Sequence, residues 1–199
     1  MTAHPTAART PKASPLPRSR LRARLVLAGF AAVGLAALAW AAFVQPLPRL
    51  IYNPSDSVPV GWYRVDPQRH GADSLPRSLS VDSIVLAPLP ATASTLAAQR
   101  GYLPTRVPLL KRVGAIAPQH VCIVAGQVRI DDVPVAAALP ADRLGRPLPS
   151  LQLCRRLESG ELFLLSVTNP ASFDSRYFGP VSASAAIGVA HPIWLEPRP

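Results

Sequence analysis

The chain has 199 residues, a formal net charge of +10, 24 prolines and a hydrophobic fraction of 49% with only 6% aromatic residues. This mixture favours a membrane segment followed by one loop-rich, strand-rich domain over a helical bundle. Residues 1–24 hold six of the 21 cations and no acid, so more than half of the excess charge lies in this tail. Because the sequence contains no zinc-ligand spacing and no basic motif interleaved with aromatics, we expect no nucleic-acid partner, no metal and no other cofactor.

The residues Leu25–Val44 form an uncharged apolar run that matches the hydrocarbon core of a bilayer, which about 20 residues span as a helix. Trp40 lies near one end, where interfacial aromatics are common. A cleavable signal peptide is an alternative, but the run is long and its flanks fit poorly. A buried core helix is a second alternative, which the complete lack of charge disfavours.

Basic residues precede this run, whereas only Arg49 follows it closely. By the positive-inside rule the tail stays in the cytoplasm and everything after Pro46 is exported, as in a single-pass protein of the bacterial inner membrane. We therefore expect a disordered basic tail over residues 1–23, a transmembrane anchor over 24–46 and an exported domain over 47–199.

Both cysteines, Cys122 and Cys154, fall in the exported part. An even count in an oxidising compartment favours a disulfide, which would close a loop of about thirty residues and contribute about 3 kcal/mol in the chain-entropy model. A cysteine nucleophile is the competing interpretation, but no well-placed histidine accompanies either thiol. His70, His120 and His191 occur in loop-like or strand-end contexts.

Apolar alternation and turn residues predict the elements of the exported part. One short helix is expected at Ala91–Arg100, with Gly101 as its C-cap. The strands are expected at Ser57–Val65 after an initial turn, Leu79–Leu86, Val107–Ile116, Val121–Ala125, Val128–Ile130, Val133–Ala136, Leu162–Val167 and Ile187–Leu195. Residues 137–160 and Thr168–Pro180 are expected to be loops. The fold class is mainly β, an antiparallel domain with one short helix, preceded by the transmembrane helix.

Lys111 lies within the apolar strand Val107–Ile116, and the only other lysine is Lys12 in the tail. Arginine keeps its proton in proteins, whereas a buried lysine can lose it and act as a base. An edge-strand or snorkelling lysine is the structural alternative. A serine hydroxyl needs a base to become a nucleophile, and in the absence of a suitable histidine a neutral lysine serves.

Three stretches carry the residues for such chemistry: S-D-S-V-P-V-G-W-Y from Ser55, P-L-L-K-R-V around Lys111, and S-F-D-S-R-Y-F-G-P-V from Ser172. In this order they resemble the membrane-bound signal peptidases with a Ser–Lys dyad, and within them the conjugative-transfer branch called TraF. The resemblance covers essentially the whole exported domain and extends to the anchor. The stretch D-S-R-Y-F-G-P-V is its most specific part.

The resemblance implies a role for each matching position. Ser57 corresponds to the nucleophile and Lys111 to the general base. Ser55 corresponds to a hydroxyl that stabilises the oxyanion, although as a turn former it has a plain structural interpretation. Ser172 corresponds to a serine that orients the lysine. Asp174 and Arg176 correspond to a structural ion pair beside the site.

The sequence departs from the family pattern in three places. Pro59 follows the expected nucleophile by two positions rather than three, which the TraF branch tolerates. The usual P-G-D after the lysine strand is Ala117-Pro118-Gln119, and the usual G-D-N is Val167-Thr168-Asn169. The short separation between Lys111 and Ser172 leaves no room for the large second domain of housekeeping leader peptidases and favours the TraF-like branch.

The resemblance implies a serine endopeptidase that cuts exported precursors after small residues. In the TraF branch the substrate is a pilin precursor, whose product can be cyclic, and the partners are the inner membrane and the conjugative transfer apparatus. A general signal peptidase and a catalytically inert, membrane-anchored assembly factor remain as alternatives.

Overall fold

The computed structural model describes residues 18–43, 49–68 and 79–197. The chain separates into two compact units, Met1–Pro46 and Leu47–Pro199. His70 and most of the predicted tail lie outside the described residues, as do the last residues of the predicted anchor.

The first unit contains one helix, α1 (Arg18–Phe43). It begins earlier than the anchor boundary predicted at residue 24, because the arginines, leucine and alanine before that boundary are good helix formers. The segment Leu21–Ala41 is long and apolar enough to cross a membrane, and its large side chains are all exposed. Length and composition alone suit either a membrane anchor or a signal sequence.

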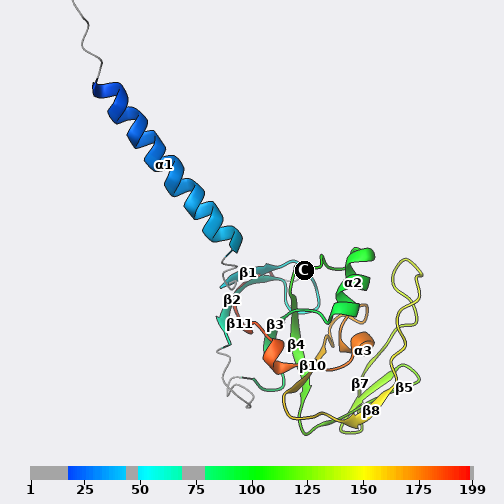
Figure 1. Ribbon diagram of the computed structural model, residues 1–199. Coiled ribbons are helices and arrows are strands. Elements are labelled where there is room, and N and C mark those ends of the chain that lie inside the picture. The colour runs from blue at the N-terminus through cyan, green and yellow to red at the C-terminus, as the bar shows by residue number, and fades with distance from the viewer. Residues whose placement is uncertain (1–17, 44–48, 69–78, 198–199) are drawn as a thin grey trace, which may run out of the picture. The chain divides into compact units, whose positions relative to one another are not determined.

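The second unit is mainly antiparallel β, as the sequence predicts (Figure 1). The larger sheet has seven strands in the order β1-β2-β11-β3-β4-β9-β10. These are β1 (Leu50–Asn53), β2 (Gly61–Pro67), β3 (Ile84–Ala87), β4 (Leu109–Ile116), β9 (Glu161–Leu165), β10 (Val181–Ser182) and β11 (Gly188–Leu195). All their pairings are antiparallel.

The smaller sheet has four strands in the order β7-β6-β5-β8. These are β5 (His120–Val124), β6 (Gln127–Ile130), β7 (Val133–Ala137) and β8 (Leu153–Arg156). Figure 1 shows β5, β7 and β8 at the opposite end of the unit from β1, β2 and β11. The helices are α2 (Ala91–Gln99), α3 (Ser175–Phe178) and a 3-10 turn, Ala183–Ala185.

In strand β2, buried and exposed side chains alternate along the sequence. Tyr63 and Val65 are buried, while Trp62 and Arg64, which alternate with them, are exposed. Gly61 opens the strand with φ +145°, and a Cβ there would lie 2.2 Å from the carbonyl oxygen of Trp194. Only glycine fits this close approach of two backbones, so Gly61 fixes where the loop before β2 ends.

Three short strands and one helix were not predicted. Strand β1 is short and pairs with the next strand, β2, whereas β8 and β10 are also short and β8 contains two arginines inside a stretch predicted to be a loop. Helix α3 lies within the predicted loop Thr168–Pro180, where the Asp174 side chain caps its first turn by accepting from the Arg176 N–H.

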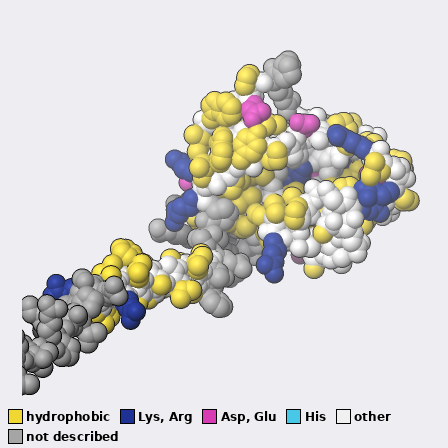
Figure 2. All heavy atoms as spheres, turned by 90° about the horizontal axis from the view of Figure 1, so that it is seen from above, with side chains coloured by type: hydrophobic (Ala, Val, Ile, Leu, Met, Phe, Trp, Pro, Cys, Tyr) yellow, Lys and Arg dark blue, Asp and Glu magenta, His cyan; other side chains and the backbone are white. Residues whose placement is uncertain are grey.

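The strands β1, β2 and β11 leave apolar surface uncovered. Figure 2 shows hydrophobic side chains gathered over one face of this unit, with Lys and Arg side chains around them. The exposed large apolar side chains of these three strands are Leu50, Tyr52, Trp62, Ile193, Trp194 and Leu195.

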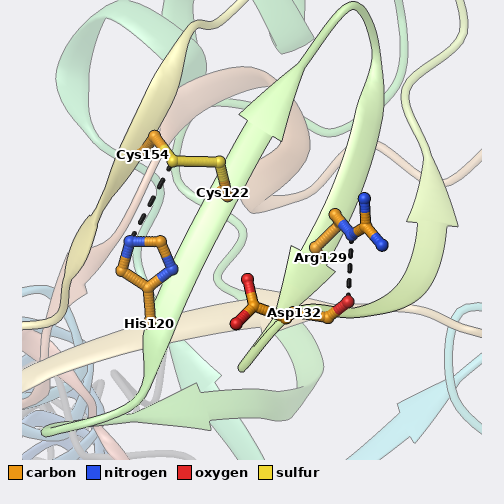
Figure 3. Close-up of a disulfide and its surroundings, with 5 residues drawn as sticks. All are labelled: His120, Cys122, Arg129, Asp132 and Cys154. Carbon is orange, nitrogen blue, oxygen red and sulfur yellow. Dashed lines mark hydrogen bonds between the residues drawn. A yellow bond between two sulfur atoms is a disulfide. The ribbon is translucent and has the colours of Figure 1, made fainter.

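Cys122 on β5 lies directly opposite Cys154 on β8, and the two form a disulfide (Figure 3). The imidazole of His120 lies beside it, with Nε2 4.0 Å from Cys154 Sγ. The bridge joins β8 to its neighbour across a sequence separation of 32 residues, most of which is irregular.

Replacing both cysteines (Cys122→Ser with Cys154→Ser) should lower the free energy of unfolding by about 3 kcal/mol, because the unfolded chain regains the entropy of the open loop. Urea denaturation of the full chain in detergent measures the change. Dithiothreitol should destabilise the wild type and leave the double variant unchanged. Equal sensitivity of both proteins to the reductant would contradict a stabilising bridge.

Candidate active site

The loop between β1 and β2 is held by two buried side chains. Asn53 ends β1 and is 5% exposed; its Nδ2 donates to the carbonyl oxygens of Ser55 at 2.8 Å, Val58 at 3.1 Å and Pro59 at 3.1 Å. Tyr63 Oη donates to the same Pro59 oxygen at 2.6 Å. The loop therefore folds back over Asn53 and presents its hydroxyls in one fixed arrangement.

Ser55 and Ser57 place their hydroxyl oxygens 3.0 Å apart. Ser55 Oγ also donates to Asn53 Oδ1 at 2.8 Å, and Ser55 N–H donates to the same oxygen at 3.2 Å. Ser57 is 7% exposed. The two hydroxyls thus form a short chain that ends on the Asn53 amide.

Lys111 lies on β4 with only 4% of its surface exposed. Burial lowers its pKa from 10.5 to about 8; the charge of Asp174 opposes this shift and that of Arg176 adds to it. The neutral amine is therefore accessible closer to neutral pH than it is for an exposed lysine. A neutral amine can accept a proton from a hydroxyl within reach.

Ser172 holds the Lys111 amine. Nζ donates to Ser172 Oγ at 2.5 Å, and Ser172 is itself only 4% exposed. Because this hydrogen bond joins β4 to the loop before α3 across 61 residues, it fixes the direction of the lysine head group.

The buried ion pair of Asp174 and Arg176 shapes that loop. Arg176 Nε donates to Asp174 Oδ1 at 2.8 Å and Nη2 to Oδ2 at 2.9 Å, in a bidentate geometry. Asp174 Oδ2 also accepts from the Ser166 N–H at 3.0 Å. The guanidinium donates further to the carbonyl oxygens of Ala137, Pro170 and Ser172. The pair therefore fixes the backbone that carries Ser172.

Ser55, Ser57, Lys111 and Ser172 all line one groove of about 1070 Å³. The groove is large enough for several residues of an extended peptide. Part of its wall is aromatic: Phe173 lies 5.5 Å from Tyr102 and 5.6 Å from Tyr177, measured between ring centroids.

A second polar cluster lies along the same groove. Arg146 Nε donates to Asp142 Oδ2 at 2.7 Å, and Tyr102 Oη donates to the same carboxylate. The Arg146 guanidinium lies over the Tyr102 ring, 5.5 Å from its centroid, and Nη2 donates to the Arg100 carbonyl oxygen at 3.2 Å. These contacts join the segment after α2 to the segment between β7 and β8.

Ser57 and Lys111 share the groove, but among the described residues no hydrogen bond joins them. Lys111 Nζ points to Ser172, and Ser57 Oγ contacts Ser55. In unliganded sites such contacts are often long and tighten only when substrate binds. His120 and His191 are not among the groove-lining residues, and no three His, Cys, Asp or Glu side chains in the described ranges are grouped to hold a metal ion.

Sequence reasoning missed Asn53 and the cluster of Tyr102, Asp142 and Arg146. An asparagine before a proline is typical of a turn, which hides its role as the anchor of the following loop. The cluster joins residues about forty positions apart, so no local pattern could reveal it.

The chain belongs to the peptidase S26 signal peptidase family, whose model (signal peptidase, peptidase S26) matches residues 22–195. Curated relatives place it beside the conjugal transfer members. A plasmid transfer protein TraF of Escherichia coli is 31% identical over 185 residues, which cover 87% of this chain and 95% of that protein.

A conjugal transfer protein TraF of Agrobacterium tumefaciens is 34% identical over 188 residues, covering 87% of this chain and 96% of the relative. A probable conjugal transfer protein TraF of Sinorhizobium fredii is 30% identical over 170 residues, covering 82% and 83%. Among solved structures, a signal peptidase I of Enterococcus faecalis is 19% identical, with a TM-score of 0.35, and covers 57% of this chain and 97% of that one.

The variant Lys111→Met should change how stability depends on pH. In the wild type the folded pKa is about 8 and the unfolded one near 10.5, so the unfolded chain binds the extra proton between these values. Wild-type stability should therefore rise from pH 8 to pH 10.5 relative to the variant, by about 3 kcal/mol. Below pH 8 the buried charge should make the wild type the less stable protein.

Urea denaturation of the full chain across this pH range measures the difference, and all other titrating groups cancel because both proteins share them. Arg112→Met is the matched control, because it removes a more exposed cation from the same strand and arginine keeps its charge throughout. A wild-type minus Lys111→Met difference that does not vary with pH would show that Lys111 is not perturbed by burial.

Proposed function

We propose that this chain is a membrane-bound serine endopeptidase that processes exported precursors, and that its substrate is a conjugative pilin subunit. The observation that carries the proposal is the shared groove, in which a buried lysine with a pKa of about 8 and a largely buried serine lie among the lining residues. Membership of the S26 peptidase family and the conjugal transfer names of the relatives support the reaction and its context.

In the proposed mechanism Ser57 is the nucleophile and Lys111 the general base. Ser57 Oγ attacks the scissile carbonyl carbon while its proton passes to the neutral Nζ of Lys111. Ser172 keeps the amine directed through the 2.5 Å hydrogen bond. Lys111 then gives the proton to the leaving amine as the peptide C–N bond breaks, which leaves an acyl-enzyme on Ser57.

The negative charge that develops on the scissile carbonyl oxygen needs hydrogen-bond donors. The Ser55 hydroxyl lies next to Ser57, and among the described residues the Ser57 N–H has no acceptor. Both are therefore positioned to serve as donors, a class of interaction whose loss typically costs 10²- to 10³-fold in kcat. Asp174 and Arg176 have a supporting role, because they shape the loop of Ser172 and touch no substrate.

The acyl group is released from Ser57 by water, or by an amine of the substrate chain itself to give a cyclic product. Hydrolysis consumes one water and frees the new carboxylate, whereas attack by an internal amine forms a peptide bond and closes the ring. In both cases Ser57 regains its proton.

The proposed location is the bacterial inner membrane, with α1 as a single anchor, residues 1–23 in the cytoplasm and the peptidase domain, residues 47–199, in the periplasm. The uncharged apolar stretch of α1, preceded by a basic flank, supports this topology. The proposed partners are the membrane, the pilin precursor and the transfer apparatus.

Ser57→Ala and Lys111→Arg should each abolish cleavage of a co-expressed conjugative pilin precursor, because one removes the nucleophile and the other replaces the base with a group that stays protonated. Immunoblotting of precursor and product measures this, with membrane fractionation as the control for insertion. Retained cleavage by Lys111→Arg would contradict the dyad. Equal cleavage of unrelated secretory precursors by the wild type would replace the pilin-specific function with a general signal peptidase.

The topology has its own test. Alkaline phosphatase fused after Pro199 should be active, because this enzyme folds only after export, whereas β-galactosidase at the same point should be inactive. Fusions after Arg18 should give the opposite pair of results. An active β-galactosidase after Pro199 would place the peptidase domain in the cytoplasm.

A further inference from the structure

The direction of each hydrogen bond around Ser57 follows from which of the neighbouring atoms can donate and which can only accept. Asn53 Nδ2 faces three carbonyl oxygens, which only accept, so this atom is the amide nitrogen and Oδ1 is the oxygen. Oδ1 can only accept, and it takes the Ser55 hydroxyl proton at 2.8 Å. A serine hydroxyl has one proton, so Ser55 has none left to donate to Ser57.

The 3.0 Å contact between the two serines must therefore use the proton of Ser57, with Ser55 Oγ accepting it. Without substrate, Ser57 therefore donates to Ser55, and Ser55 donates to Asn53. The Ser57 proton points toward Ser55 rather than toward Lys111, whose amine is engaged by Ser172.

We infer that Asn53 is a positioning residue of this site, which holds the Ser55 hydroxyl against Ser57 and keeps the Ser57 proton on the Ser55 side until a substrate binds. The inference rests on the proposed function and specifies how its nucleophile is controlled. Asn53 acts only through Ser55 and the loop and touches no reacting atom.

When a peptide binds, the hydrogen bonds between Ser57, Ser55 and Asn53 rearrange. As the carbonyl oxygen of the scissile bond gains negative charge, it becomes a stronger acceptor than the neutral Asn53 amide, so the Ser55 proton turns to it. Lys111 takes the Ser57 proton as the C–O bond forms. No bond to Asn53 forms or breaks, and its part is to hold Ser55 where both arrangements are possible.

The contacts of the buried Asn53 side chain point to Ser55 as its partner. Asn53 is 5% exposed and both of its polar atoms are engaged, the oxygen by Ser55 and the nitrogen by the loop carbonyls. The nitrogen contacts and the Ser55 N–H contact to Oδ1 hold the loop backbone, whereas the Ser55 hydroxyl contact to Oδ1 holds a side chain. The oxygen contact points to Ser55 and predicts an energetic coupling between these two residues.

A double-mutant cycle tests the inference with the full chain in detergent and a purified pilin precursor. Ser55→Ala should lower kcat about 100-fold, and Asn53→Ala about tenfold or more with KM changed less than about threefold. When Ser55→Ala is already present, adding Asn53→Ala should change kcat by less than about threefold, because the route through the Ser55 hydroxyl is gone and only the loop contacts of Asn53 remain. Losses that multiply in the double variant would show that Asn53 supports only the loop and would overturn the inference.

Tyr63→Phe is the matched control, because it removes a 2.6 Å hydrogen bond to the same loop without touching Ser55. Its effect on kcat should be the same with and without Ser55→Ala. Thermal unfolding of every variant reports folding, and Asn53→Ser takes the place of Asn53→Ala if the latter does not fold, with the same expected coupling. A coupling of Tyr63→Phe as large as that of Asn53→Ala would also overturn the inference.

The wild type and Ser57→Ala, measured in the same assay, distinguish a failure of the proposed function from a failure of the role inferred for Asn53. Cleavage by the wild type that Ser57→Ala abolishes supports the proposed function, and the cycle then decides the role of Asn53 alone. Absence of cleavage by the wild type, or cleavage that survives Ser57→Ala, would overturn the proposed function and this inference with it.

Discussion

The burial of one amine is the constraint on which the rest of the site depends. A lysine head group removed from water favours its neutral form, and this burial is the largest cause that lowers the pKa of Lys111 to about 8 against the opposing charge of Asp174. The neutral form still needs a hydrogen-bond partner, because an unpaired buried polar group is costly. Ser172 supplies that partner, so the same contact that satisfies the amine also directs it.

The Asp174–Arg176 pair shows how a buried charge pair is made tolerable. Taking two charges out of water costs several kcal/mol per ion unless geometry and further hydrogen bonds compensate. Here the carboxylate accepts backbone N–H groups, and the guanidinium donates to carbonyl oxygens from two parts of the chain, Ala137 and the loop before α3. The pair therefore acts as a scaffold for the loop of Ser172, and its two charges shift the pKa of Lys111 in opposite directions.

The strands β2 and β4 could be predicted from the sequence, because buried and less buried residues alternate along most of each, and the start of β11 could be predicted because its glycine admits no side chain. The strands β1 and β8 could not, since each has only four residues of mixed character, and the partner of β8 is distant in sequence. The mainly β class and the signal peptidase family are confirmed by the sheets and by the family match. The catalytic roles of Ser57 and Lys111 stay predictions, carried by motif order and by the shared groove. The anchoring of the loop by Asn53 could not be predicted, because it depends on how residues 54–59 fold back.

The cluster of Tyr102, Asp142 and Arg146 joins two irregular segments along the groove without contacting Ser57 or Lys111. These segments follow α2 and β7, whereas the proposed catalytic groups come from β4 and from loops fixed by buried side chains. This wall of the groove and the proposed catalytic groups are thus carried by different parts of the chain. Such a division is modular. The two segments could change in length or sequence to suit other substrates, as long as they keep contacts like those of Tyr102, Asp142 and Arg146, without moving Ser57 or Lys111.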